Sequence, residues 1–209
     1  MFDYEYLMSF VAGLPGLLLA LVLHEYAHAR VAVAMGDFTP KLTGRLTLNP
    51  IAHIDPIGLI MLLVVHFGWA KPVMVNPRNF KDMKKGNILV ALAGPMANFV
   101  IAFIAMFVIA LMYKIDIQMT LGAYKVIKLI ALYNIYFGIF NLIPIPPLDG
   151  SKILLEFLPR EYAYKYMALE RYSFIILIVI IMTPVLSGIL MPLANLIWNI
   201  YSLILSFIF

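Results

Sequence analysis

The chain has 209 residues, of which 64% are apolar and only 12% are charged, and its mean hydropathy is +0.96. A soluble domain carries about 25% charged residues and about half apolar ones, so this composition excludes a water-soluble globular protein and predicts an integral membrane protein. The net charge of +4 comes without the basic tracts of a nucleic-acid-binding protein, and the absence of cysteine excludes disulfides, thiolate metal ligands and a cysteine nucleophile.

The first predicted membrane span runs from Tyr6 to about Met35. Its first 18 residues, Tyr6 to Leu23, carry no charge. With about 30 residues at 1.5 Å each, the helix is long enough, at about 45 Å, to cross the hydrocarbon core. The residues before it lack the basic leader and cleavage site of a signal peptide, so the span is expected to be retained. Gly36 and Asp37 form the predicted stop.

The segment after the first span is predicted to contain two short β-strands and a re-entrant piece. Apolar and polar residues alternate within 38–51, mainly from Leu42 to Leu48, and again from Lys71 to Asn76, which is the period-two pattern of strands. Residues 57–69 are apolar but too few to cross a bilayer unaided. They are interpreted as a re-entrant or interfacial segment.

Two further full-length spans are predicted, at 87–112 and at about 121–143. The proline-rich residues 144–147 end the second of them, and polar residues then dominate 149–171, which indicates a surface segment with an amphipathic helix. Residues 172–209 carry no charge. They fit either two short spans or one span kinked at its prolines, so the sequence leaves their span count open.

The basic residues of the loops predict the orientation. Loops 36–87 and 144–172 hold 7 and 4 of the 15 Lys and Arg residues. The positive-inside rule therefore places both loops in the cytoplasm and the N-terminus outside. The chain has no internal repeat or low-complexity segment, so we expect an all-α polytopic membrane protein with a single integral-membrane domain over 1–209.

The stretch His24-Glu25-Tyr26-Ala27-His28 interrupts the first span with three ionisable residues. Helix positions i and i+4 share a face, so both imidazoles can reach one metal ion with Glu25 beside it. Each ionisable group inside a membrane costs about 2.5 kcal/mol or more. That cost favours a functional pairing over the plain alternative, a polar helix end that extends toward the interface. Two imidazoles and a carboxylate suit zinc, and an open fourth position makes such a site catalytic.

Two imidazoles need a third ligand, and Asp149 in Pro146-Pro147-Leu148-Asp149-Gly150 is the candidate. His24 and His28 lie toward the inner end of an out-to-in span, and Asp149 lies just past the inner end of another. The three residues are therefore expected at a similar depth on one side. The alternative is that Asp149 only caps a helix that starts near Gly150.

Two motifs in this order resemble the site-2 protease family of intramembrane zinc metalloproteases. They are His24 to His28 and Asn141-Leu142-Ile143-Pro144-Ile145-Pro146-Pro147-Leu148-Asp149-Gly150, and Gly94-Pro95-Met96-Ala97-Asn98 is similar to the family's middle core helix. The resemblance covers about residues 10–155 and is to the compact prokaryotic members, without a PDZ-like insertion or a nucleotide-sensing CBS domain. It implies a three-helix catalytic core over 10–155, followed by peripheral C-terminal helices at about 156–209.

The resemblance also implies the site. His24, His28 and Asp149 are expected to ligate zinc, one ion per chain, and Glu25 is expected to be the general base. This assignment agrees with the chemistry of a zinc site, in which a carboxylate takes the proton from a metal-activated water.

Several other polar residues are weighed beside these four. Asn141 is a candidate oxyanion donor, with an ordinary interhelical hydrogen bond as the alternative. Asn98 is a candidate for placing substrate or for a hydrogen bond across the core. His53 and Asp55 are a candidate supporting pair or minor metal site, although a polar turn is the simpler interpretation, and His66 fits an interfacial or packing role.

The predicted function is zinc-dependent intramembrane endopeptidase activity on peptide bonds in or near transmembrane segments, as in regulated intramembrane proteolysis. The expected location is the cell membrane, with the site toward the cytoplasm. Expected partners are transmembrane substrates and the lipid bilayer, with no nucleic acid, and the association of copies into a homo-oligomer is left open. A substrate helix has to unwind to be cut, and the family resemblance implies that segments 42–48 and 71–76 receive it by strand addition.

Two other classes of function are weighed against the protease. A metal-binding transporter or channel would place weak sites through the bilayer, whereas the ionisable groups here converge at one depth. A catalytically inactive relative that only grips helices would not need Glu25.

Overall fold

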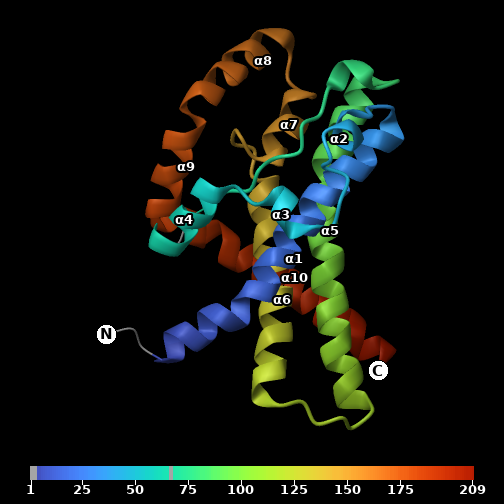
Figure 1. Ribbon diagram of the computed structural model, residues 1–209, viewed down its shortest axis with the longest axis vertical. Helices are drawn as coiled ribbons and strands as arrows, with labels where there is room; N and C mark the ends of the chain where they lie inside the picture. Colours follow the sequence, from blue (N-terminus) through green and yellow to red (C-terminus); the bar gives the residue numbers. More distant parts are fainter. Residues whose placement is uncertain (1–3, 66–67) are drawn as a thin grey trace.

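The computed structural model describes residues 4–65 and 68–209, and most of them are helical (Figure 1). The helices in chain order are α1 (Tyr4–Met35), α2 (Thr39–Leu42), α3 (Pro50–His53), α4 (Pro56–Val65), the 3-10 helix η1 (Pro77–Asn79), α5 (Met83–Lys114), α6 (Leu121–Leu142), α7 (Asp149–Leu155), α8 (Arg160–Met167), the 3-10 helix η2 (Ala168–Tyr172), α9 (Ser173–Met182) and α10 (Pro184–Ile208). Four described helices, α1, α5, α6 and α10, are long and apolar enough to cross a membrane. The polytopic helical fold is confirmed.

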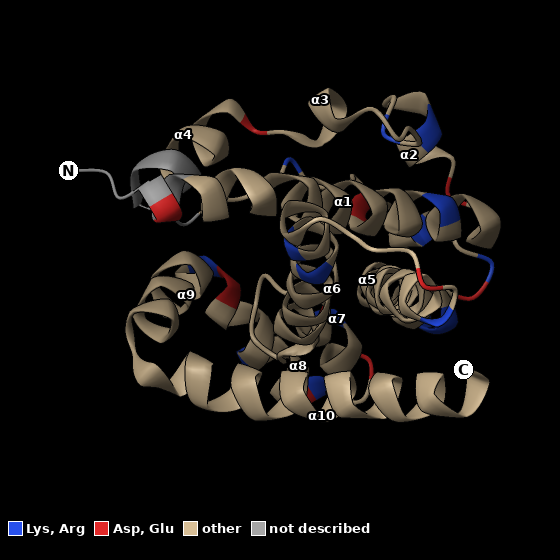
Figure 2. Ribbon diagram, turned by 90° about the horizontal axis from the view of Figure 1, so that it is seen from below, with Lys and Arg blue, Asp and Glu red and all other residues tan. Residues whose placement is uncertain are grey.

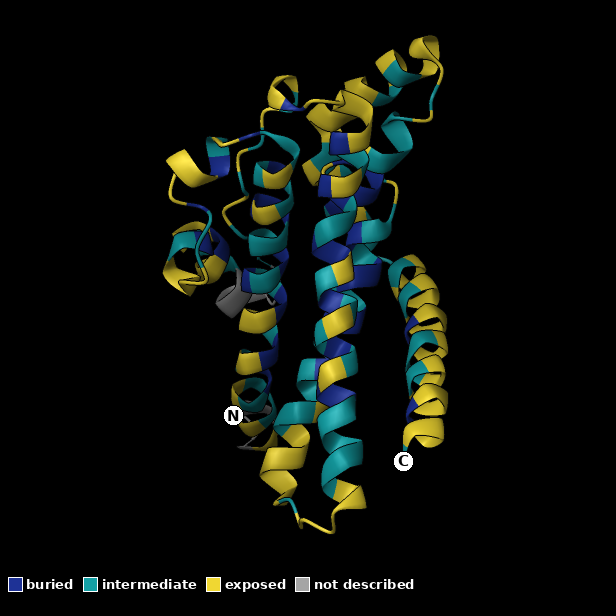
Figure 3. Ribbon diagram, turned by 90° about the vertical axis from the view of Figure 1, so that its right-hand side faces the viewer, coloured by how far each residue is buried: buried dark blue, intermediate teal, exposed yellow. Residues whose placement is uncertain are grey.

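Helices α1, α5 and α6 pack against one another as a three-helix core (Figures 1 and 3). They alternate in direction: α1 and α6 run toward the end of the molecule that carries α2, α7 and α8, and α5 runs away from it. Alanines are buried in all three of these helices, namely Ala20, Ala32, Ala91, Ala102 and Ala131. Small residues let helix backbones approach closely, which is how membrane helices gain packing contacts without a hydrophobic driving force.

The C-terminal segment contributes one full-length span. Helix α10 crosses the bundle obliquely and packs on α6 and α5, where Ala194 joins Ile135 and Ile139, and Leu205 joins Met106 (Figures 1 and 2). Helix α9 has 10 residues, about 15 Å of helix, which is half the hydrocarbon thickness. The question left open by the sequence is therefore answered by one span preceded by a short helix.

The first span stops where the sequence predicted. Gly36 has a φ of +111°, a left-handed conformation that suits glycine and ends the helix. The next residue, Asp37, is fully buried. Its carboxylate accepts hydrogen bonds from the backbone N–H and hydroxyl of Thr39, from Asn76 N–H and from Asn79 Nδ2. One carboxylate thus joins the end of α1 to the segment before α5.

Asp37 should make the fold sensitive to acid. Burial alone would raise its carboxyl pKa, but the hydrogen bonds from Thr39, Asn76 and Asn79 hold that pKa below the usual range. Because the folded-state pKa is the lower one, the stabilisation is present above the unfolded-state pKa of about 4 and is lost as the pH falls through the folded-state value. We expect Asp37→Asn to lower the free energy of unfolding at pH 7 by about 3 kcal/mol, and this deficit should shrink as the pH falls below about 4.

The check on Asp37 is unfolding in mixed detergent micelles, followed by circular dichroism between pH 3 and pH 7. Asp82→Asn is the matched control, because Asp82 is exposed and caps α5 at Lys85 N–H, and Asn caps a helix as well as Asp does. A deficit for Asp37→Asn that stays constant across this pH range would contradict the assignment.

The two predicted strands are wrong. In the described part of the chain the structure has no strand, only an isolated bridge between Ile54 and Ala70. Residues 38–51 form α2, turns and the start of α3 instead. Both short helices have a proline in their first turn. Asn49 caps α3 at the Ile51 N–H, and Asp37, which precedes α2, accepts from the Thr39 N–H. The 71–76 segment has no ladder because two of its N–H groups, those of Val73 and Asn76, donate to side chains.

The re-entrant interpretation of 57–69 gains no support either. Most of this segment is helix α4, which Asp55 caps by accepting from the N–H groups of Ile57 and Gly58. The structure shows a helix of 10 residues there, and α4 lies beside the bundle rather than within the three-helix core (Figure 1). Residues 66 and 67, and with them His66, lie outside the described residues.

Candidate metal centre

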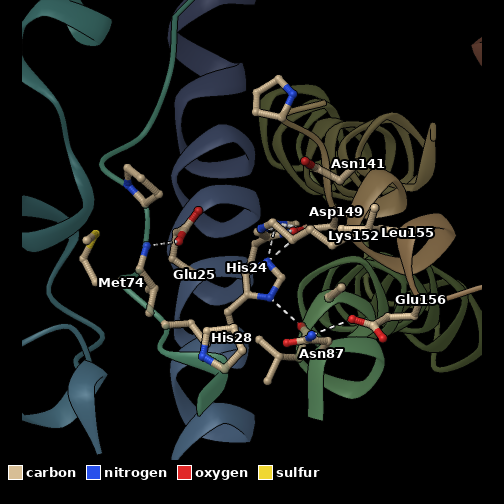
Figure 4. A pocket seen from close by; sticks show the side chains of 17 residues that line it. His24, Glu25, His28, Met74, Asn87, Asn141, Asp149, Lys152, Leu155 and Glu156 are labelled. Atoms are coloured by element: carbon tan, nitrogen blue, oxygen red, sulfur yellow. Dashed lines mark hydrogen bonds and ion pairs between the residues drawn. The ribbon is translucent and has the colours of Figure 1, made fainter. Parts of the chain in front are cut away.

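His24, His28 and Asp149 converge on one point, as Figure 4 shows. The two Nε2 atoms lie 2.9 Å apart, and Asp149 Oδ2 lies 3.1 Å from His24 Nε2 and 3.0 Å from His28 Nε2. All three side chains are buried, with exposed fractions of 3%, 7% and 4%. The sequence motif and the distant aspartate therefore meet as the depth argument predicted.

The hydrogen bonds behind the imidazoles orient their lone pairs toward this point. His28 Nδ1 lies 2.6 Å from the carbonyl of Val90, which can only accept, so Nδ1 carries the proton. His24 Nδ1 lies 2.7 Å from Asn98 Oδ1 and is likewise the donor. In neutral imidazoles with this arrangement, both Nε2 atoms present lone pairs to each other and to Asp149 Oδ2.

Three facing lone pairs repel one another unless a cation lies among them. No hydrogen-bond donor reaches Asp149 Oδ2 within the described part of the chain, although the atom is buried. Zinc bonds of about 2.0–2.1 Å in a tetrahedral site would separate such ligand atoms by about 3.3 Å, close to the distances found here. The donor set of two imidazoles and a carboxylate therefore fits zinc, with one position left for water or substrate.

Gly94 of α5 provides the space for this cluster. A Cβ atom at residue 94 would lie 2.4 Å from His28 Nε2 and 2.6 Å from His24 Nε2. Any larger residue would therefore push the two imidazole nitrogens apart or fill the position of the ion. The glycine of Gly94-Pro95-Met96-Ala97-Asn98 is thus a requirement of the metal centre.

Asp149 is delivered to the cluster by the first turn of α7. Gly150 allows this turn to lie against the end of α6, because a Cβ atom there would be 2.2 Å from the carbonyl oxygen of Leu142. Lys152 Nζ lies 3.0 Å from Asp149 Oδ1, which leaves Oδ2 as the oxygen directed at the histidines.

Glu25 lies beside the cluster, in a cavity of about 490 Å³ that opens onto it. Its Oε2 accepts a hydrogen bond of 2.9 Å from the backbone N–H of Val73. Residues 72–75, here called the strap, form one wall of the cavity, and Asn141, Lys152 and Glu156 lie on the other side (Figure 4). The arrangement places a carboxylate within a water-accessible space next to the metal position.

The two asparagine candidates take different places. Asn141 lines the cavity and donates through Nδ2 to the carbonyl of Phe137 in its own helix, and among the described residues no interhelical hydrogen bond of its side chain is found. Asn98 is wholly buried behind His24 and does not line the cavity. Its position supports the hydrogen bond across the core and not a contact with substrate.

His53 and Asp55 do not come together as a metal site in the described structure. The Asp55 carboxylate caps α4, and the described residues show a metal-ligating group only at His24, His28 and Asp149. His53 is buried and donates through Nε2 to the carbonyl of Thr47, which holds the loop before α3. The polar-turn interpretation fits these contacts.

Three features of the site were missed in the sequence. They are Lys152, the strap contact at Glu25 and the buried Asn134. The last two depend on elements that are distant in the chain, whereas Lys152 lies one turn from Asp149 in α7. The sequence could have indicated a role for Asn134, because an amide inside an apolar span costs free energy unless it finds a hydrogen-bond partner.

The chain is similar to named zinc metalloproteases along most of its length. It is 41% identical over 183 residues to the Bacillus subtilis (strain 168) protein "Putative zinc metalloprotease YwhC", a match that covers 86% of this chain and 84% of the relative. It is 29% identical to "Putative zinc metalloprotease Rip2" of Mycolicibacterium smegmatis, over 88% of this chain and 71% of the relative.

A third relative and a family model also indicate a metalloprotease. "Zinc metalloprotease MJ0392" of Methanocaldococcus jannaschii is 28% identical over 71% of this chain and 34% of its own length. The model of peptidase family M50 matches residues 110–184, which include Asn141 and Asp149. No solved structure matches the chain.

Proposed function

Since this chain belongs to the site-2 protease family of zinc metalloproteases, peptidase family M50, we propose that it is an intramembrane endopeptidase that cuts transmembrane segments of other proteins. The observation that carries the proposal is the convergence of His24, His28 and Asp149 inside a bundle of apolar helices. A hydrolytic site buried among membrane spans is useful only for a substrate that is itself in the membrane.

His24, His28 and Asp149 would hold the zinc ion through Nε2, Nε2 and Oδ2. Zinc bound there would supply Lewis-acid chemistry, activating a water and polarising the peptide carbonyl. Glu25 is the general base. With Oε2 held by the Val73 N–H, Oε1 is the oxygen that takes the proton of the attacking water and returns it to the leaving nitrogen.

Asn141 is the proposed donor to the carbonyl oxygen as negative charge develops on it. One Nδ2 hydrogen is engaged with Phe137 O, and the second remains for the cavity, which Asn141 lines. Such donors act strongly because their position is fixed before the reaction begins. The hydrogen bond to Phe137 provides this fixed position.

The strap is the proposed docking site for the unwound substrate. The strap forms one wall of the cavity and is attached to Glu25 through the Val73 N–H. An extended substrate that pairs with the strap would lie along this cavity. Strand addition therefore remains the proposed recognition mode, although the strap forms no strand by itself.

The site is proposed to face the cytoplasm of a bacterial-type cell membrane. The metal centre lies toward the end of the bundle that carries α2, α7 and α8, and this end holds the basic loops 36–87 and 144–172 (Figure 1). The positive-inside rule assigns such an end to the cytoplasm. Water then has a short path to the cavity, and the partners are single-span or multi-span proteins of the same bilayer.

The test is reconstitution of the purified, zinc-loaded protein in liposomes with a set of single-span proteins that carry Gly or Pro within the span. We expect zinc-dependent products cut within or next to the span, and none after chelation of the metal. Zinc flux into the vesicles is measured in parallel. Flux without cleavage, at an enzyme concentration equal to that of the substrates, would favour the metal transporter instead.

A further inference from the structure

A chain of amide hydrogen bonds crosses the centre of the bundle behind the metal centre. Asn98 Nδ2, on α5, donates to the carbonyl of Ala20 on α1 at 2.8 Å and to Asn134 Oδ1 on α6 at 3.0 Å. Asn134 Nδ2 donates to the carbonyl of Ile130 at 2.8 Å. Both asparagines are wholly buried. The three core helices thus share one polar network at the depth of His24.

The direction of every bond in this network is fixed by its two ends. The carbonyls of Ala20 and Ile130 can only accept, so each must face an NH₂ group. Asn134 therefore presents Oδ1 to Asn98, and Asn98 presents Oδ1 to His24. An amide oxygen is only an acceptor, so His24 must carry its proton on Nδ1 and leave Nε2 free to bind a metal.

We propose that Asn98, held in orientation by Asn134, is a positioning residue that fixes the tautomer of the metal ligand His24. The inference deepens the proposed function and rests on His24 being a zinc ligand. Neither asparagine touches the metal position or the cavity, so both act through the imidazole. A metal-binding histidine generally depends on such a partner at its other nitrogen.

The network is needed because, without a metal, His24 could instead carry its proton on Nε2. If His24 carried its proton on Nε2, that proton would point at His28 Nε2, 2.9 Å away, and the two histidines would satisfy each other. This pair leaves no lone pair on His24 Nε2, the nitrogen that faces Asp149, and so excludes the ion. Asn98 Oδ1 disfavours it, because the deprotonated Nδ1 would then face an oxygen lone pair at 2.7 Å.

The first readout is the zinc dissociation constant, measured by competition with a chromophoric chelator on the full-length protein in detergent. Asn98→Leu keeps the branched shape of the side chain but has no acceptor, and zinc binding should weaken by about 10–100-fold. Asn134→Leu loosens the Asn98 amide while Ala20 still holds it, so we expect a loss of about tenfold, at the low end of the range for such partners.

The matched control is Ile135→Val. Ile135 is as buried as Asn134 and is the next residue on α6, so this variant reports the effect of a small packing defect alone. Zinc affinity should stay at the wild-type value. A loss in Ile135→Val equal to that in Asn134→Leu would overturn the proposal, because packing would then explain both.

The second readout needs no metal. Nitrogen chemical shifts of the His24 ring in the zinc-free protein report which nitrogen is protonated, and we expect Nδ1–H in wild type and a shift toward Nε2–H in Asn98→Leu. Nδ1–H in both proteins, or unchanged zinc affinity in Asn98→Leu, would overturn the inference. If Asn98→Leu fails to fold, Asn134→Leu decides the matter by the same two measurements. Failure of wild type to bind zinc would instead overturn the proposed function.

Discussion

Glu25→Gln should lower the cleavage rate of a membrane reporter by about 10²–10⁴-fold, the range that a general base contributes. Gln has the same shape and its amide oxygen still accepts the Val73 N–H, so the strap should stay in place. What Gln lacks is the ability to take a proton from water. Zinc content should not change, because Glu25 is not among the converging ligand atoms. The measurement pairs kcat on the reporter with zinc content by atomic absorption.

Glu156→Gln is the control for Glu25. This carboxylate lines the same cavity and accepts a hydrogen bond from Asn87 Nδ2, which a Gln oxygen also accepts. Its cleavage rate should stay within a few-fold of wild type. Full activity in Glu25→Gln at full zinc content would show that Glu25 is not the base.

Asp149→Ala should abolish cleavage by releasing the metal. Removal of a supporting partner costs a site about 10–100-fold in metal affinity, so removal of a direct ligand should raise the zinc dissociation constant by more than about 100-fold. The variant should be at least as stable as the metal-free wild type. In the metal-free wild type the buried Asp149 Oδ2 faces two imidazole lone pairs and has no hydrogen-bond donor among the described residues, and the variant removes this repulsion. Chelator competition and detergent unfolding measure the two quantities.

Ser151→Ala provides the comparison for Asp149→Ala. Ser151 is buried in the same turn of α7, and its hydroxyl donates to Leu148 O. The variant disturbs the turn without removing a ligand, so its zinc affinity should stay within a few-fold of wild type. Equal zinc affinity in Asp149→Ala and wild type would remove Asp149 from the site.

The spans and the convergence of His24, His28 and Asp149 were predictable because they depend on local patterns or on depth in the membrane. A span is recognised by an uncharged run, and the positions i and i+4 of His24 and His28 already define one face of a helix. Asp149 followed from topology, since alternate spans end on the same side. In each case the inference needed no knowledge of how two helices pack.

The failed predictions and omissions concern segments whose conformation is decided by distant partners. The 38–51 pattern is that of a strand, yet two short helices form there, one after Asp37 has bound the Thr39 N–H and one capped by Asn49. In 71–76 the N–H groups that would form a ladder are taken by Glu25 and Asp37. Alternation of apolar and polar residues shows which side chains share a face, but it does not show which groups the backbone N–H atoms bind. It therefore could not distinguish a strand from a short helix or an extended segment.

The metal centre has contributions from α1, α5, α6 and α7, and this has a consequence for biogenesis. A nascent chain that has inserted only its first span contains Glu25 and both histidines, but its ligand set is incomplete until residue 149 has left the ribosome. Gly94 and the Asn98 amide also arrive before Asp149 does. The three side chains can therefore converge only late in membrane insertion, and chains truncated by interrupted translation would lack the complete cluster.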